Sequence, residues 1–164
     1  MNIIILGANS GIAKEVAKIM ATEHNSLFLV SQNEEKLKRL ESDLNLRGDG
    51  NCVSKAMDLT HISSHQQILT EAENFFKGDI HLVFIAYGIL GDQEQAEKDF
   101  SECEKIIQTN LTSTLSLLHL SANYMESKNA GQIVCISSVA GDRGRKKNYV
   151  YGSTKAAITV ALSG

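Results

Sequence analysis

The stretch LGANSGIAKEVA, residues 6–17, decides the fold because it places a glycine-containing turn between an apolar run and a helical pattern. The run NIIIL, residues 2–6, is rich in β-branched residues and too short for a helix, so it predicts a strand. Gly7 permits a tight turn, Gly11 lets the backbone approach a phosphate, and Ala13 lets a helix pack closely on the strand. A helix N-terminus also offers free N–H groups to an anion. We predict a dinucleotide pyrophosphate site, with a turn that binds no ligand as the alternative; its residues are Gly7, Asn9, Ser10, Gly11 and Ile12.

Outward from this loop, short apolar runs alternate with longer helical patterns. The runs lie at 26–31, 51–57, 80–88 and 132–137, and the helical patterns at 10–22, 33–46, 60–77, 94–108 and 110–128. This alternation predicts an α/β fold: a Rossmann-type, doubly wound parallel sheet in three α/β/α layers. The unbroken run Ile3–Leu6 indicates a strand that is buried on both faces.

Composition narrows the possible functions. The 164 residues are 43% hydrophobic, which fits one domain spanning 1–164. A net charge of -3 argues against nucleic acid and favours a small-molecule partner. Three cysteines without a C-x-x-C pair suit free thiols in the cytoplasm, and no apolar run reaches the roughly 18 residues of a membrane span. The last pattern, 149–164, reads as a helix that stops abruptly, so we expect a chain truncated in the helix that starts near Tyr151.

The end of the second predicted strand bears on the choice of cofactor. An acidic residue there binds the ribose 2′-OH of NAD, and a basic one accommodates the 2′-phosphate of NADP. This chain has Ser31 and Gln32, which carry neither charge. The missing carboxylate slightly favours NADP(H) over NAD(H), because a phosphate would not be repelled. Lys36 could reach the site, although a lysine on a charged helix face is usually only solvated.

The stretch NYVYGSTK, residues 148–155, holds a candidate for acid–base chemistry. If a helix begins near Val150, Tyr151 and Lys155 lie four residues apart on one face. A fixed cation close to a phenol favours the phenolate, so Tyr151 could transfer protons near neutral pH. The alternative is an ordinary amphipathic helix with an exposed lysine. Tyr149 has no lysine at this spacing, and we interpret it as a packing residue.

With G-x-x-x-G-x-A at its start and Y-x-x-x-K about 140 residues later, the chain resembles the short-chain dehydrogenase/reductase family. Other landmarks of that family occur in order: an aspartate after the third strand, an asparagine in a long helical region and a serine thirteen residues before the tyrosine. The matching residues are Asp58 followed by Leu59, Asn110 and Ser138. The resemblance implies that Asp58 contacts the adenine of the cofactor and that Leu59 also belongs to the cofactor site. The usual N-A-G motif after the fourth strand is replaced by Ala86-Tyr87-Gly88. The resemblance implies cofactor contacts at Ala86 and Gly88, and only the asparagine and the middle alanine of the family motif differ.

The resemblance implies an NAD(P)(H)-dependent oxidoreductase that acts on a carbonyl/alcohol pair. Tyr151 would donate a proton to the carbonyl oxygen, and Ser138 would hydrogen-bond the same oxygen. Lys155 would hold the nicotinamide ribose, and Asn110 would fix a proton-relaying water. Individually these residues have plainer interpretations, such as a helix cap for Asp58. The alternative function is a non-catalytic dinucleotide-binding regulator with the same fold.

A narrower resemblance lies in GDRGR, residues 141–145, which is similar to the decaprenylphosphoryl-keto-ribose 2-reductase branch. It implies that Arg143 and Arg145 meet an anionic substrate, a keto sugar on a polyprenyl phosphate. The alternative is a solvated basic loop.

Two further patterns carry less weight. His61 and His65 lie four residues apart but lack a third ligand and a general base, so we expect no metal site. The apolar stripe Leu115, Leu118 and Ala122 is interpreted as core. By analogy with the family, the same helix and the one starting at Tyr151 would form the interface of a homodimer or homotetramer.

Overall fold

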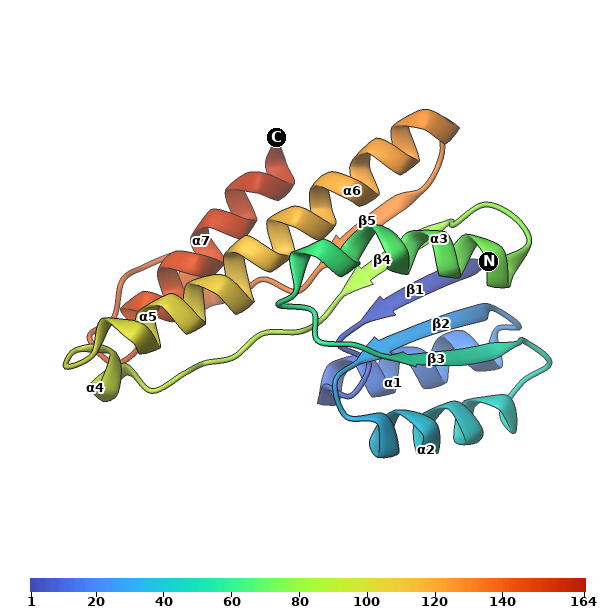
Figure 1. The fold of residues 1–164 in the computed structure, drawn as a ribbon, viewed down its shortest axis with the longest axis horizontal. Helices are drawn as coiled ribbons and strands as arrows, with labels where there is room; N and C mark the ends of the chain where they lie inside the picture. The colour runs from blue at the N-terminus through green and yellow to red at the C-terminus, as the bar shows by residue number, and fades with distance from the viewer.

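A parallel five-stranded sheet forms the centre of the computed structural model, which describes residues 1–164 (Figure 1). The strands are β1 (Asn2–Leu6), β2 (Ser26–Ser31), β3 (Cys52–Ala56), β4 (Leu82–Ile85) and β5 (Gln132–Cys135). They are arranged in the order β3-β2-β1-β4-β5, and every neighbouring pair is parallel. The chain therefore reverses its direction of winding between β1 and β4, the position at which doubly wound folds bind their ligands.

Helices cover both faces of this sheet. They are α1 (Gly11–Thr22), α2 (Glu34–Asn45), α3 (His65–Phe76), α4 (Gln93–Ala96), α5 (Phe100–Ile107), α6 (Ser113–Lys128) and α7 (Tyr149–Ser163). One hydrophobic cluster joins the sheet to α1 and α2, and a second joins its opposite face to α3 and α6 (Figure 1). No helix combines the length and apolar character needed to cross a membrane. The predicted three-layer α/β architecture is confirmed.

The central strand shows why the apolar runs became strands. Ile3 and Ile5 point into the cluster with α1 and α2, while Ile4 and Leu6 point into the cluster with α3 and α6. All four side chains are at most 1% exposed. Because successive residues of a strand face opposite sides, only an unbroken apolar run can fill both faces.

Several predicted elements differ in their limits. The single helix predicted at 94–108 is two helices, because Asp92 and Asp99 each cap a new N-terminus, of α4 and α5. The pattern at 60–77 begins with a turn, and α3 itself starts at His65. A π-helical segment, Gln108–Thr112, links α5 to α6.

Two predictions about packing are corrected by the structure. In the stripe interpreted as core, Leu118 is partly buried and packs against the second hydrophobic cluster, but Leu115 is 40% exposed and Ala122 is exposed. The buried face of α6 instead contains Leu117 and Met125, because the helix is rotated relative to the assumed stripe. Tyr149, interpreted as a packing residue, is 45% exposed at the first turn of α7.

Candidate active site

The loop between β1 and α1 presents unused backbone N–H groups at the N-terminus of a helix. Gly7 has a φ of +84°, in the left-handed region that favours glycine, and Ser10 caps α1 by accepting a hydrogen bond from the Ala13 N–H. No hydrogen bond within the chain uses the backbone N–H groups of Asn9, Gly11 and Ile12. Free donors at the positive end of a helix are the features that hold a phosphate.

Asn9 ties this loop to the end of β2. Its Nδ2 donates to the Asn33 carbonyl at 3.0 Å, and Asn33 in turn caps α2. The Asn9 Oδ1 is buried without a hydrogen-bond partner. An unsatisfied buried oxygen is costly, which is consistent with a partner that a bound ligand supplies.

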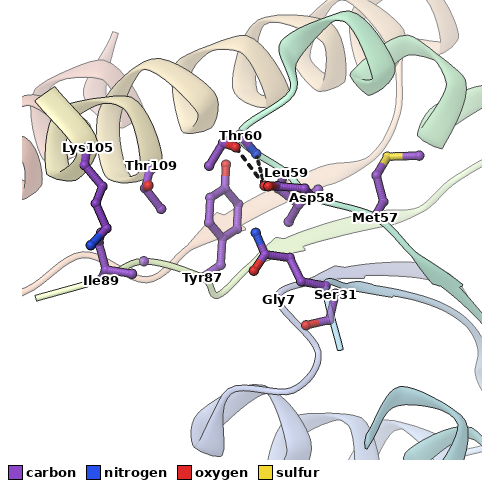
Figure 2. A pocket seen from close by; sticks show the side chains of 12 residues that line it. Gly7, Ser31, Met57, Asp58, Leu59, Thr60, Tyr87, Ile89, Lys105 and Thr109 are labelled. Atoms are coloured by element: carbon purple, nitrogen blue, oxygen red, sulfur yellow. Dashed lines mark hydrogen bonds between the residues drawn. The ribbon is translucent and has the colours of Figure 1, made fainter. Parts of the chain in front are cut away.

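Beside this loop lies a cavity of about 390 Å³ at the carboxyl end of the sheet (Figure 2). Its wall includes Gly7 from the phosphate-binding loop, Ser31 and Gln32 from the end of β2, and Asp58 and Leu59 after β3. Five residues predicted to bind a dinucleotide, from three separate parts of the sequence, thus line one space.

The segment after β3 offers both an acceptor and a donor to this cavity. Asp58 Oδ1 accepts hydrogen bonds from the Thr60 N–H at 2.9 Å and the Thr60 hydroxyl at 2.8 Å. Partial burial raises the pKa of Asp58, but the hydrogen bonds from Thr60 and Gln32, together with the nearby His61, outweigh it and hold the pKa below its ordinary value. The Leu59 N–H makes no hydrogen bond within the chain. The ionised Asp58 carboxylate can accept a hydrogen bond, and the free Leu59 N–H can donate one. Together they suit the polar edge of a nucleobase.

A second cavity of about 300 Å³ continues the first and contains two of the four predicted catalytic residues, while Asn110 and Ser138 line neither cavity. It shares Tyr87, Gly88 and Ile89 with the first cavity and adds Tyr151 and Lys155. The two cavities therefore form a groove that runs from the end of β2 past the end of β4 to α7. Such a groove has room for an extended ligand with one part in each cavity.

Tyr151 and Lys155 have the predicted relation on α7. The Lys155 Nζ lies 5.8 Å from the centre of the Tyr151 ring and donates to the Ile136 carbonyl at 2.8 Å. Lys155 is only 5% exposed, and this burial lowers its pKa below the ordinary value. The Lys155 Nζ is therefore held beside the Tyr151 ring, which the helical spacing alone could not establish.

Ser138 approaches the same helix on a tight turn. It caps the 3₁₀ turn Val139–Gly141, and its Oγ accepts from the Ala140 N–H at 3.2 Å. A Cβ built at Gly152 would lie 2.5 Å from the Ala140 carbonyl oxygen, so only glycine allows the turn to pack against α7. Gly152 directly follows Tyr151, so this contact holds the serine turn against the helix that carries the tyrosine.

Asn110 is buried in the π-helical segment, where its side chain hydrogen-bonds two other parts of the chain. Its Oδ1 accepts from the Ile89 N–H at 2.8 Å, and its Nδ2 donates to the Ile89 carbonyl at 2.7 Å and to the Thr154 Oγ1 at 3.4 Å. Both N–H donors and the oxygen of the side-chain amide take part in these bonds. Its role in fixing a water stays a prediction, while its contacts join the lining segment at Ile89 to α7.

Some predicted residues lie elsewhere, and others were missed. Arg143 and Arg145 are exposed and line neither cavity, so their substrate contact stays a prediction. Thr154 was not predicted, because its partner Asn110 lies 44 residues away along the chain. Tyr87 was noted only as a departure from the family motif, because its partner Ser113 is also distant in sequence. Lys105 and Thr109 also line the first cavity. They lie four residues apart, just before Asn110, and this helical spacing could have identified them.

His65 is a core residue. Its Nε2 lies 2.8 Å from the Leu59 carbonyl and its Nδ1 lies 2.9 Å from the Ser116 Oγ. A carbonyl only accepts, so Nε2 carries the proton and Nδ1 accepts from the serine. Both ring nitrogens are thus used inside the fold, behind the segment that carries Leu59.

This histidine predicts a pH dependence of stability. Burial lowers the pKa of His65, despite the opposing effect of the Leu59 carbonyl, so the unfolded chain binds a proton more readily than the folded one. The free energy of unfolding should therefore fall as the pH drops below about 6.5. In His65→Gln, an amide donor that does not titrate could still reach Leu59. Urea denaturation at several pH values should give a smaller acid loss for this variant; equal losses would contradict the prediction.

Comparisons with known proteins agree with this geometry. The family model for short chain dehydrogenase matches residues 1–163. An uncharacterized oxidoreductase of Mycobacterium tuberculosis is 33% identical over 164 residues, which cover 99% of this chain and 64% of that protein. The chain therefore spans less than two thirds of the length of that relative.

Two solved structures illustrate the shared fold. NAD+-bound xylitol dehydrogenase matches with a TM-score of 0.88 and 24% identity, covering 98% of this chain and 64% of that one. An actinorhodin polyketide ketoreductase variant with NADPH matches with a TM-score of 0.85 and 21% identity, covering 98% and 62%. At this level of identity the likeness extends to the fold.

Proposed function

The chain belongs to the short-chain dehydrogenase family, and on that premise we propose that its protein is an NAD(P)(H)-dependent oxidoreductase that interconverts a carbonyl and a secondary alcohol, most simply as a reductase. The observation that carries the proposal is the meeting of Tyr151 and Lys155 in a cavity that continues the groove from the phosphate-binding loop. A protein that only bound the dinucleotide would have no physical need for a phenol beside a buried cation at that end of the groove.

The groove fits a nicotinamide dinucleotide. The free N–H groups of Asn9, Gly11 and Ile12 would hold the pyrophosphate, and a Cβ built at Gly11 meets no atom within 4 Å, so the loop is open on that side. Asp58 and Leu59 would bind the adenine, and Lys155 the nicotinamide ribose. When bound, the nicotinamide supplies or accepts the hydride.

The remaining chemistry belongs to the chain's own residues. In the reducing direction the Tyr151 hydroxyl donates a proton to the substrate oxygen, and the Ser138 hydroxyl donates a hydrogen bond to the same oxygen as negative charge develops. The Ser138 Oγ can do so because its bond to Ala140 uses only a lone pair. Lys155 keeps a positive charge beside the phenol, and Asn110 holds the lining segment at Ile89 in place.

NADP(H) is the favoured cofactor. The related folds include one protein solved with NAD+ and another with NADPH, so the fold accepts both. In this chain Ser31 and Gln32 line the cavity at the end of β2, where no carboxylate would repel a 2′-phosphate.

Assembly and location extend the proposal. The exposed Leu115 and Ala122 on α6 support a homodimer or homotetramer formed through α6 and α7, because apolar side chains there would gain from burial. The free cysteines fit a cytoplasmic enzyme.

Titration of the full-length protein with NADPH and NADH, followed by nicotinamide fluorescence, tests cofactor binding. Loss of NADPH absorbance with a panel of ketones and keto sugars then tests catalysis. Tighter binding of NADPH and turnover of at least one carbonyl are expected. Binding without turnover across the panel would instead identify a dinucleotide-binding regulator.

The substrate within this proposal is a keto sugar on a polyprenyl phosphate, met by Arg143 and Arg145 on the exposed basic loop. Replacing both with alanine should raise KM for a phosphorylated keto sugar by about tenfold or more, because charge-assisted hydrogen bonds to phosphate are lost. KM for a small neutral ketone should change little. Arg39→Ala, at an exposed ion pair with Glu35 on α2, is the control for general loss of charge. An equal rise in KM for both substrates would exclude an anion site on this loop.

A further inference from the structure

Tyr87 stands in the motif Ala86-Tyr87-Gly88, the place where this chain departs from the N-A-G pattern of the family it resembles. Its side chain lines both cavities of the groove. In Figure 2 the ring rises between Thr109 on one side and the segment of Leu59 and Asp58 on the other. A large side chain at this point must have a role in shaping the groove.

The Tyr87 hydroxyl lies within a chain of hydrogen bonds that runs from Thr114 to the Leu59 carbonyl. It lies 2.6 Å from the Ser113 Oγ and 3.3 Å from the Thr114 Oγ1, and Ser113 also bonds the Leu59 carbonyl. A carbonyl only accepts, so Ser113 must donate to Leu59. Since a hydroxyl has one proton, Ser113 then accepts from Tyr87, and Tyr87 accepts from Thr114. One direction of donation runs through the whole chain.

Tyr87 can keep this donor role across the working pH range. Burial raises the pKa of Tyr87 to about 12, despite the hydrogen bonds to Ser113 and Thr114. The phenol therefore stays protonated and uncharged at neutral pH. It acts as a fixed link, in contrast to Tyr151 at the other end of the groove.

On its other side Tyr87 touches the phosphate-binding loop. A Cβ built at Gly7 would lie 2.6 Å from the Tyr87 Cβ and 2.8 Å from the Tyr87 backbone nitrogen, which shows how closely the two residues pack. Tyr87 thus contacts Gly7 directly and reaches Leu59 through Ser113. Gly7 and Leu59 lie in two separate segments of the chain, and both segments line the first cavity.

We infer that Tyr87 is a positioning residue for the cofactor: it joins the phosphate-binding loop at Gly7 to the base-binding segment at Leu59, and this link sets the affinity for the adenosine half of the dinucleotide. The Leu59 carbonyl is held by Ser113 and His65, so the chain segment at Leu59 is fixed at the wall of the first cavity. The inference rests on the cofactor groove of the proposed function.

Tyr87→Phe, Ser113→Ala and the double variant test this link in the full-length protein. Calorimetric titration with 2′,5′-ADP should show each single variant binding roughly 3- to 10-fold more weakly, the size of one net hydrogen bond. The double variant should be no weaker than the weaker single variant, because both changes break the same link. Affinity for reduced nicotinamide mononucleotide should stay within about twofold.

Tyr124→Phe is the matched control. Its hydroxyl is also hydrogen-bonded, accepting from the Ile80 N–H and donating to Glu73, but it lines neither cavity. It should lower the melting temperature and leave 2′,5′-ADP binding unchanged. Unchanged binding by Tyr87→Phe, additive losses in the double variant, or an equal loss in Tyr124→Phe would overturn the inference. Failure of the wild-type protein to bind NADPH or NADH would instead overturn the proposed function, and is measured separately.

Discussion

Tyr151→Phe should lower kcat by about 10²- to 10⁴-fold, the usual contribution of a positioned general acid. The affinity for NADPH should stay within about twofold, because the ring and its contact with Lys155 are retained and only the hydroxyl is lost. Steady-state kinetics with any accepted carbonyl and a fluorescence titration with NADPH give the two measurements. A fall in kcat without a change in cofactor binding is the signature of a lost proton donor.

Tyr149→Phe provides the control for this experiment. Tyr149 lies two residues away on the same first turn of α7, but it is 45% exposed and lines neither cavity. Its kcat should remain within about twofold of the wild-type value. Retained turnover in Tyr151→Phe would remove the phenol from the mechanism, whereas an equal loss in both variants would point to disturbed helix packing.

Local patterns in the sequence were enough to predict the strands and several of the residues that line the two cavities. The run Ile3–Leu6 could only be a strand buried on both faces, and Tyr151 and Lys155 share a helix face through their spacing alone. The helix break between α4 and α5 was also readable, since Asp92 and Asp99 are typical capping residues. The prediction of a single helix at 94–108 followed the apolar pattern and not these two capping residues.

Contacts between distant segments could not be predicted in the same way. The hydrogen bond of Asn110 to Ile89 spans 21 residues, and the bond of Tyr87 to Ser113 spans 26. No local periodicity records such pairings. The rotation of α6 that exposes Leu115 depends on the packing of the whole helix, so its buried face was also beyond a short stripe.

Gly7→Ala should cost roughly 2–5 kcal/mol of unfolding free energy, the sum of a left-handed backbone strain and an overpacked contact. The φ of +84° disfavours any residue with a Cβ, and that Cβ would lie 2.6 Å from the Tyr87 Cβ and 2.8 Å from its backbone nitrogen. Neither atom can move without shifting the end of β4. Urea denaturation, with circular dichroism to monitor unfolding, measures the loss. Cofactor binding should weaken as well, because the phosphate-binding loop would shift.

Gly11→Ala separates the structural role of this loop from its binding role. A Cβ built at Gly11 meets no atom within 4 Å, so the unfolding free energy should be unchanged or should rise by less than about 1 kcal/mol. NADPH affinity should nevertheless fall by about tenfold or more, because the new methyl group would occupy the space in which the pyrophosphate approaches the backbone. If Gly11→Ala bound NADPH as tightly as the wild-type protein, the pyrophosphate could not lie against this turn. If the Gly7→Ala variant proved as stable as the Gly11→Ala variant, the result would contradict the close packing of Tyr87 on this loop.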